Sequence, residues 1–229
     1  MKDSGIEWLG EVPKHWDVIS IKNLIRTERI EIQDGNHGEL HPLSSDYVEI
    51  GIPFIMANDI NEGKINLTDA KKIPLELAES LRIGFSITGD VLLTHKGTIG
   101  RVAVVPEIKS RYIILTPQVT YYRINNKETL NNFWFYYFFQ SVSFLNQIEQ
   151  VAGQGSTRSY IGLIAQKELK IALPPLREQK LINDYLQSVL IKTDSAINHC
   201  EKEITLIEEY RTALINEAVT GKIKVTESV

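Results

Sequence analysis

No stretch of this chain is apolar for long enough to cross a membrane, since a spanning helix needs about 20 such residues in a row. The first residues do not join a basic end to an apolar run, so they predict no secretory signal. Cysteine occurs once, as Cys200, which excludes a disulfide within the chain and favours a reducing compartment. These absences predict a cytoplasmic protein without membrane contact.

The chain also lacks an overall positive charge. Its 229 residues carry a net charge of −4, which argues against a uniformly basic coat for nucleic acid. Residues 95–127 are the exception, because this segment contains several basic residues and only one acidic residue, Glu107. The basic residues are Lys96, Arg101, Lys109, Arg111, Arg123 and Lys127. Such a patch could neutralise phosphates, although a solvated strand face would show the same composition.

A nucleotide-binding loop is not evident either. The segment Gly97-Thr98-Ile99-Gly100-Arg101 is rich in glycine but lacks the Gly-x-x-x-x-Gly-Lys-Ser/Thr spacing. A strand is predicted after it, so no helix N-terminus is available there to hold a phosphate. A tight hairpin is therefore favoured over a nucleotide site.

We find no arrangement of residues that predicts catalysis. His37 and His41 have the spacing of a zinc-binding helix, but the neighbouring glycines and proline argue against a helix there. Glu-x-Lys triplets begin at Glu107, Glu168 and Glu178, without an upstream acidic residue at the end of a strand to complete a nuclease site. No Ser/His/Asp or Cys/His set is recognisable. We expect no catalytic residue, no metal and no enzymatic activity in this chain.

Two consecutive prolines, Pro174 and Pro175, divide the chain into parts of different character. Before them, short β-branched and aromatic runs alternate with Gly, Asn and Pro, which predicts one α+β domain over residues 1–173. Strands are expected at 54–56, 65–67, 91–94, 102–105 and 119–123, with a turn at 61–64 and a buried helix between 129 and 151. The segment 153–159 is expected to be a loop.

After the prolines, 44 residues from Leu176 to Val219 contain no Gly or Pro, and as one helix they would be about 66 Å long. Apolar residues recur at alternating spacings of four and three, which is typical of a coiled coil. The expected pairing positions are Leu186, Leu190, Ile197, Cys200, Ile204, Ile207 and Leu214, with Thr193, Arg211 and Ala218 completing the seam. A helix folded back on its own domain is the alternative. We expect a long dimerisation helix over residues 174–222 and a tail over 223–229.

Several motifs resemble the specificity subunit of Type I restriction–modification systems. They are Trp8-Leu9-Gly10-Glu11-Val12-Pro13-Lys14-His15-Trp16, Gly89-Asp90-Val91-Leu92-Leu93-Thr94, Gly97-Thr98-Ile99-Gly100-Arg101-Val102-Ala103-Val104-Val105, Leu173-Pro174-Pro175-Leu176-Arg177-Glu178-Gln179 and Ala218-Val219-Thr220-Gly221-Lys222. Each is moderately specific, but together they follow one another in the family's order over nearly the whole chain.

The resemblance implies a DNA-reading protein without a catalytic centre. A full subunit of that family carries two target-recognition domains joined by two long antiparallel helices, and each domain reads half of a split double-stranded DNA site. It also holds adenine-N6 methyltransferase subunits, on which S-adenosylmethionine is expected, and in the complete complex translocase–nuclease subunits. This sequence has one such domain, at 1–173, and one helix, without an internal repeat.

Two-fold symmetry would restore the missing half. If two chains pack their C-terminal helices antiparallel, the homodimer displays two recognition domains. A two-fold protein requires a palindromic site, so we expect a bipartite, palindromic target. Pairing with a different half-subunit remains open.

Candidate DNA contacts follow from side-chain chemistry. Lys96 and Arg101 flank the glycine loop, where a bare backbone could approach DNA closely, and Thr98 lies within this loop. Lys109 and Arg111 are expected to position phosphates. Four further candidates, suited to base edges or phosphates, lie in the polar loop: Gln154, Ser156, Thr157 and Arg158.

Two other functions are compatible with the sequence. A coiled-coil scaffold with a protein-binding head would show no salt-dependent affinity for duplex DNA, whereas a DNA reader would lose affinity steeply as salt rises. A stand-alone nuclease would cleave DNA by itself in the presence of a divalent metal.

Overall fold

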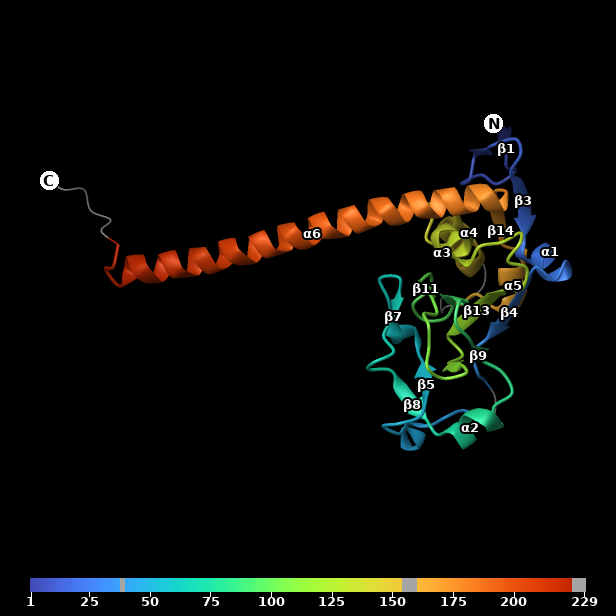
Figure 1. Ribbon diagram of the computed structural model, residues 1–229, viewed down its shortest axis with the longest axis horizontal. Coiled ribbons are helices and arrows are strands. Elements are labelled where there is room, and N and C mark those ends of the chain that lie inside the picture. Colours follow the sequence, from blue (N-terminus) through green and yellow to red (C-terminus); the bar gives the residue numbers. More distant parts are fainter. Residues whose placement is uncertain (38–39, 154–159, 224–229) are drawn as a thin grey trace. The chain divides into compact units, whose positions relative to one another are not determined.

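The computed structural model describes residues 1–37, 40–153 and 160–223, and the chain forms two compact units (Figure 1). The first unit is Met1–Asn183 and the second begins at Asp184. The first unit mixes sheets and helices and the second is helical, so the predicted α+β class is confirmed.

A four-stranded antiparallel sheet lies at the centre of the first unit. Its order is β11 (Val102–Val104), β10 (Val91–Thr94), β13 (Val119–Ile124) and β4 (Ile30–Asp34). A second sheet has the order β8 (Lys71–Ile73), β5 (Ile52–Ile55), β12 (Ile113–Leu115) and β9 (Phe85–Ser86), with β12 parallel to β5. Three small ribbons complete the strands: β1 (Lys2–Asp3) with β2 (Glu11–Val12), β3 (Asp17–Ser20) with β14 (Lys170–Leu173), and β6 (Ile60–Asn61) with β7 (Lys64–Ile65).

The helices of the first unit are short. They are α1 (Ile21–Arg26), α2 (Leu75–Ser80), α3 (Asn132–Phe139), α4 (Val142–Gly153) and α5 (Leu163–Glu168), with 3-10 turns η1 (Ser44–Asp46) and η2 (Ala57–Asp59). The long helix α6 (Leu176–Val219) coincides with the 44-residue segment that contains no Gly or Pro, and it lies within the range 174–222 predicted for the helix. Among the described residues, no helix has both the length and the apolarity needed to cross a membrane.

The apolar residues of β10 are consecutive because the strand is buried on both faces. Successive side chains of a strand point to opposite faces, and both faces of β10 are covered. Val91 and Leu93 pack into one buried cluster with the aromatic residues of α3 and α4, whereas Leu92 packs into another with strands of the second sheet. The central sheet is therefore buried on both sides, which holds the turns at its two ends in fixed positions.

The helix predicted between 129 and 151 is wrong as a single element, because the structure has two helices there. The break falls at Gln140 and Ser141, where the Ser141 hydroxyl accepts a 3.3 Å hydrogen bond from the Phe144 amide and caps α4. The break allows Phe139 and Phe144 to stack with centroids 4.3 Å apart. Side-chain packing therefore outweighs the continuity of the apolar pattern.

Three strands were also predicted to end too far toward the C-terminus, and one of them is β11, which ends at Val104 and not at residue 105. Strand β5 ends at Ile55, because the Met56 amide donates a 2.7 Å bond to Asp59 and starts η2. Strand β7 ends at Ile65. The predicted turn is confirmed as a tight hairpin, with φ of 49° at Glu62 and 75° at Gly63, as expected for a two-residue loop of the primed type.

Candidate nucleic-acid interface

The glycine-rich segment forms a closed hairpin between β10 and β11. The Thr94 amide donates to the Arg101 carbonyl at 2.9 Å, and the Thr94 hydroxyl accepts from the Arg101 amide at 3.0 Å. Gly97 and Gly100 have φ of 80° and 90°, a backbone region that favours glycine. The predicted hairpin is therefore confirmed, and it presents Lys96 and Thr98 as exposed side chains.

This hairpin lies beside the chain that follows the predicted polar loop. The Ile161 amide donates to the His95 carbonyl at 2.9 Å, and Lys96 forms a β-bridge with Tyr160. The Lys96 ammonium lies 6.0 Å from the centre of the Tyr160 ring, which is 45% exposed. We call Lys96, Gly97, Thr98 and Tyr160 the glycine-loop surface. Residues 154–159, with the predicted contacts Gln154, Ser156, Thr157 and Arg158, lie outside the described residues.

Arg101 has a second role that the sequence did not reveal. Its Nη1 donates to the carbonyls of Ala57 and Ile60 at 3.3 and 3.1 Å, and the side chain is half-buried. These bonds tie the base of the hairpin to the η2 turn. Contact between Arg101 and DNA stays a prediction.

A buried polar network supports the glycine-loop surface from below. The Thr120 hydroxyl donates to Asp34 at 2.6 Å, and Gln166 donates to Thr120 at 3.0 Å and to the Ile161 carbonyl at 2.8 Å. His95 is 1% exposed, and its Nε2 lies 3.4 Å from Asp34 without the alignment of a hydrogen bond. Burial lowers the pKa of the His95 imidazole, and this outweighs the opposing effect of Asp34. The imidazole is therefore neutral in the folded chain.

The neutral imidazole predicts a loss of stability in mild acid. Between the lowered pKa of His95 in the folded chain and about 6.5, its usual value in an unfolded chain, the unfolded chain binds a proton that the folded chain does not. The free energy of unfolding therefore decreases as the pH is lowered through this window, by up to ~1.4 kcal/mol per pH unit. Urea unfolding between pH 7.5 and 5 measures this slope. The variant His95→Gln should lose that part of the slope, and the exposed His41→Gln should keep it. Equal slopes in the wild type and His95→Gln would contradict the assignment.

The predicted phosphate contacts Lys109 and Arg111 lie at the opposite end of β10. They follow β11, next to the turn before β10, where the Gly89 amide donates to the Val105 carbonyl at 2.9 Å and the Ile108 amide to the Thr88 hydroxyl at 3.3 Å. Both basic side chains are exposed. The structure thus divides the predicted contacts between the two ends of one buried strand.

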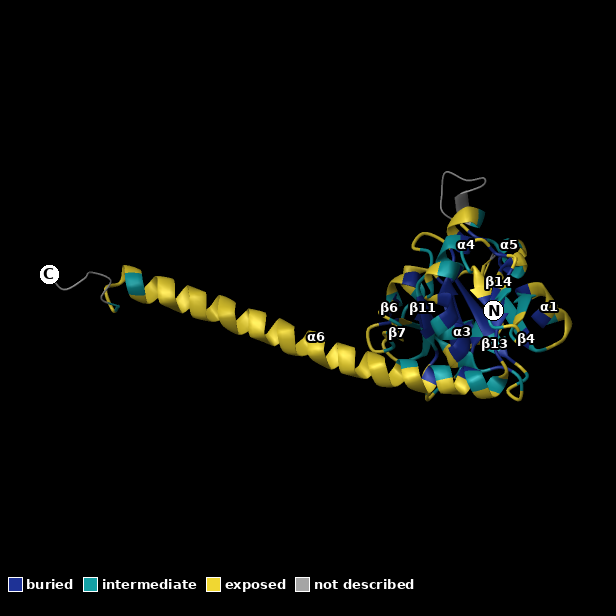
Figure 2. Cartoon of the chain, turned by 90° about the horizontal axis from the view of Figure 1, so that it is seen from above, coloured by how far each residue is buried: buried dark blue, intermediate teal, exposed yellow. Residues whose placement is uncertain are grey.

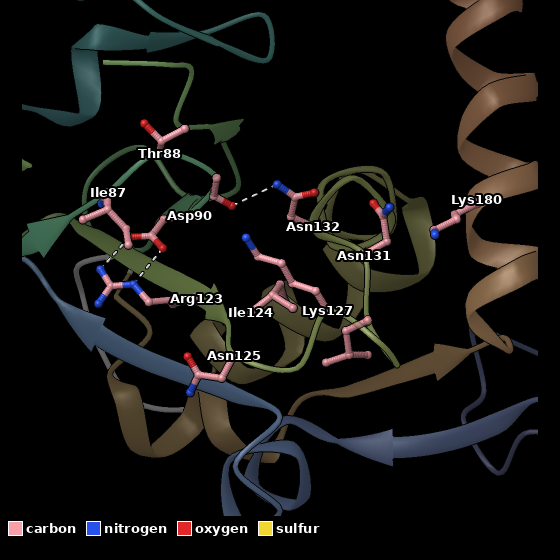
Figure 3. A pocket seen from close by; sticks show the side chains of 12 residues that line it. Ile87, Thr88, Asp90, Arg123, Ile124, Asn125, Lys127, Asn131, Asn132 and Lys180 are labelled. Atoms are coloured by element: carbon pink, nitrogen blue, oxygen red, sulfur yellow. Dashed lines mark hydrogen bonds and ion pairs between the residues drawn. The ribbon is translucent and has the colours of Figure 1, made fainter. Parts of the chain in front are cut away.

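A polar cavity of about 500 Å³ opens beside this turn (Figure 3). Lys127 and Lys180 contribute exposed ammonium groups to its lining, and Asn132 donates a 3.0 Å bond to the Gly89 carbonyl. Arg111 lines a neighbouring hollow, and both hollows are bordered by Ile87 and Arg123. This side of the unit is therefore more basic than the candidate list predicted.

Asp90 and Arg123 form a bidentate ion pair at the edge of that cavity. The two charge-assisted bonds from Arg123 Nε and Nη2 measure 2.9 and 2.8 Å, and Asp90 also accepts from the Ser86 hydroxyl and the Ile87 amide. Asp90 is 1% exposed. In the sequence, Asp90 is recognisable only as part of the Gly89–Thr94 motif and Arg123 only as a basic residue, since nothing in their spacing indicates that they meet.

The Leu173–Gln179 motif joins the start of α6 to the first unit. Glu178 accepts from Trp16 at 2.9 Å and from His15 at 2.7 Å, and these bonds lower the pKa of its carboxyl. The fully buried Gln179 accepts from the Asn131 amide and donates to the carbonyls of Thr129 and Pro174. The side chains of Glu178 and Gln179 in this motif thus hold the start of α6 against the rest of the first unit.

The predicted pairing positions all lie on α6 within the second unit. Figure 2 shows that most of this helix is exposed. From 184 to 219 every residue is exposed except Leu186 and Ala218, which are half-buried. The predicted pairing positions other than Leu186 are exposed: Leu190, Ile197, Cys200, Ile204, Ile207 and Leu214.

Among the described residues no group of three His, Cys, Asp or Glu side chains could hold a metal ion.

Comparison with known proteins links this arrangement to one family. The model of the Type I restriction modification DNA specificity domain matches residues 13–206. The Type I restriction enzyme MjaVIII specificity subunit of Methanocaldococcus jannaschii is 25% identical over 95% of this chain and 48% of its own length. The EcoKI specificity subunit of Escherichia coli K12 is 24% identical over 93% of this chain and 44% of its own length.

Solved structures show the same fold. A chain from a study of complex assembly and conformational transition of the type I R-M system superposes with a TM-score of 0.69 at 20% identity, covering 91% of this chain and 47% of that chain. The HsdS subunit from Thermoanaerobacter tengcongensis gives a TM-score of 0.57 at 20% identity, over 81% of this chain and 40% of the subunit. The chain spans about half the length of the curated relatives that it matches.

Proposed function

The chain belongs to the family of Type I restriction modification DNA specificity domains, and from this premise we propose that its first unit reads one half of a bipartite DNA target. The chain pairs through α6 and recruits adenine-N6 methyltransferase subunits that carry S-adenosylmethionine. In a complete complex it also binds translocase–nuclease subunits. The chain supplies the sequence preference, and its partners supply the catalysis.

The glycine-loop surface is the observation that carries the proposal. Lys96 and Thr98 stand on a hairpin whose base is fixed by the buried sheet and by the polar network under His95. A ring at Tyr160 offers a stacking face next to the Lys96 ammonium. Exposed polar groups on loops of a rigid scaffold are typical of a surface that reads bases.

The remaining candidates have complementary roles in this proposal. Lys109 and Arg111, at the other end of β10, neutralise phosphates and set the orientation of the duplex. Gln154, Ser156, Thr157 and Arg158 directly precede Tyr160 in the chain and contribute to base reading.

Pairing through α6 accounts for the second half of the target. An apolar stripe exposed along the second unit requires a partner helix, and a second copy of the chain supplies one. Two copies related by a two-fold axis read a palindromic, bipartite sequence. A different half-subunit in the partner position would instead give an asymmetric bipartite sequence.

Mapping of adenine methylation across a genome tests the proposal. Cells would express this chain together with a methyltransferase subunit known to be active with another specificity subunit. We expect a split, palindromic motif that disappears when the chain is deleted. No chain-dependent methylation would contradict DNA reading and favour a scaffold that binds protein.

The phosphate contacts are tested by the salt dependence of duplex binding. We expect the logarithm of the affinity to fall linearly with the logarithm of the salt concentration, and Lys109→Ala and Arg111→Ala each to reduce the slope by about one. The matched control is Lys22→Ala, since Lys22 is exposed on α1 and pairs with Glu168 at 3.3 Å. Equal slopes for all three variants would remove these residues from the interface.

A further inference from the structure

The seam on α6 has an internal symmetry that the pairing proposal does not use. Its ten positions run from Leu186 to Ala218 at spacings of four and three in strict alternation, beginning and ending with four. The order of spacings is therefore the same from either end, and its midpoint is at residue 202. All ten positions belong to the second unit.

We infer that α6 pairs with α6 of a second copy in one antiparallel register, in which residue 202 of both copies is level with the two-fold axis. This inference rests on the proposed pairing and on the antiparallel direction expected from the resemblance, and it adds the alignment of the two helices. In this register every seam residue faces another seam residue. The facing pairs are Leu186 with Ala218, Leu190 with Leu214, Thr193 with Arg211, Ile197 with Ile207, and Cys200 with Ile204.

The polar members of the seam identify this register among the alternatives. Thr193 and Arg211 interrupt the apolar series, and only here do they face each other, which leaves all other layers apolar. A shift by one heptad places Arg211 against Leu186 or Cys200 and shortens the seam. A single charged residue at such a position sets the register of a coiled coil because misaligned pairings bury it against apolar side chains.

Charge also separates the antiparallel from the parallel arrangement. In a parallel pair Arg211 faces Arg211 of the partner subunit, so two like charges meet in the seam. In the antiparallel register Asp194 of the partner subunit lies within about 1.5 Å of Arg211 along the axis, because each residue rises 1.5 Å. The guanidinium can therefore reach an opposite charge at the edge of the seam.

Acidic residues near the centre of the helix pair oppose its association. Glu201 and Glu203 flank residue 202, so each approaches its own copy across the axis. Salt screens repulsion between exposed carboxylates. Salt also screens the attraction between Arg211 and Asp194 of the partner subunit, so the register is tested under conditions in which both effects are weak.

Single cysteines test the register directly. In a Cys200→Ala background, chains with Ile197→Cys and chains with Ile207→Cys, distinguishable by mass, are mixed and mildly oxidised in 0.5 M salt, roughly the range in which surface charges are screened. A disulfide requires Cα atoms within about 7 Å. Facing positions meet this requirement, whereas copies of residue 197 lie about 15 Å apart along an antiparallel axis. Sedimentation equilibrium of the same samples reports association without cross-linking.

We expect disulfide-linked dimers that contain one Ile197→Cys chain and one Ile207→Cys chain. We expect no disulfide-linked dimer when either variant is oxidised by itself. Linkage of Ile197→Cys chains to one another would overturn the inference in favour of parallel helices. Dimers seen in sedimentation equilibrium without a disulfide between Ile197→Cys and Ile207→Cys chains would also overturn the register. A third variant, Leu190→Cys, tests a shift by one heptad, because a disulfide between it and Ile207→Cys would indicate that shifted register. Both outcomes leave the proposed pairing intact. A monomer at every concentration would overturn both, and methylation mapping still tests DNA reading separately.

Discussion

Replacing Asp90 with alanine is expected to lower the free energy of unfolding of the first unit by about 3–5 kcal/mol, because the change leaves Arg123 without its buried partner. Two further donors, the Ser86 hydroxyl and the Ile87 amide, lose their acceptor as well. In a unit of this size the melting temperature should fall by roughly 10–15 °C. Thermal unfolding followed by circular dichroism measures the change.

Glu31→Gln is the matched control for this prediction. Glu31 is 3.9 Å from Arg123 at its closest, and its side chain is 45% exposed, so its loss should cost about 1 kcal/mol or less. A cost for Asp90→Ala as small as that of Glu31→Gln would contradict the assignment of Asp90 to the stability of the sheet. Methylated motifs should stay unchanged wherever Asp90→Ala is folded, since Asp90 stabilises the fold without reading bases.

Replacing Ile204 with aspartate is expected to weaken helix pairing by at least about a thousandfold. A two-fold pair contains the substitution twice, and each copy loses roughly 2 kcal/mol or more of apolar burial, where 1.4 kcal/mol corresponds to tenfold in affinity. Placing a charge in the seam adds a desolvation cost. Sedimentation equilibrium should show monomers, and chain-dependent methylation of the split motif should disappear.

Asn198→Asp provides the control, because it adds the same charge to an exposed position outside the seam of the same helix. Its pairing and its methylation should remain close to those of the wild type. Equal behaviour of the two variants would show that the seam is not the pairing surface. The first unit should unfold at the same temperature in both variants, since neither position belongs to it.

The sequence predicted the elements whose pattern is local. The hairpin at Glu62 and Gly63 follows from turn chemistry, and the bounds of α6 follow from 44 residues without Gly or Pro. The break between α3 and α4 depends on the stacking of Phe139 on Phe144, which no local pattern expresses. Such contacts are decided by the surrounding core.

The candidate site shows the same division. Lys96 and Thr98 were identified because they lie at or in a glycine loop whose bare backbone could approach DNA, and the structure places both on the surface. The half-buried Arg101 and the pair of Asp90 with Arg123 depend on partners 33 or more residues away in the chain. A basic residue that binds a carbonyl cannot be distinguished by sequence from one that is free to bind a phosphate.

The exposure of α6 has a consequence for how the second unit folds. A helix gains most of its stability from an apolar face that packs, and nearly every side chain from 184 to 219 is exposed. Helix formation and association should therefore be coupled, so that helical circular dichroism rises with protein concentration. Amide hydrogens of this segment should exchange quickly in dilute samples and slowly in concentrated ones, while those of β10 stay protected at every concentration. The measured affinity would then include the free energy of forming the helix.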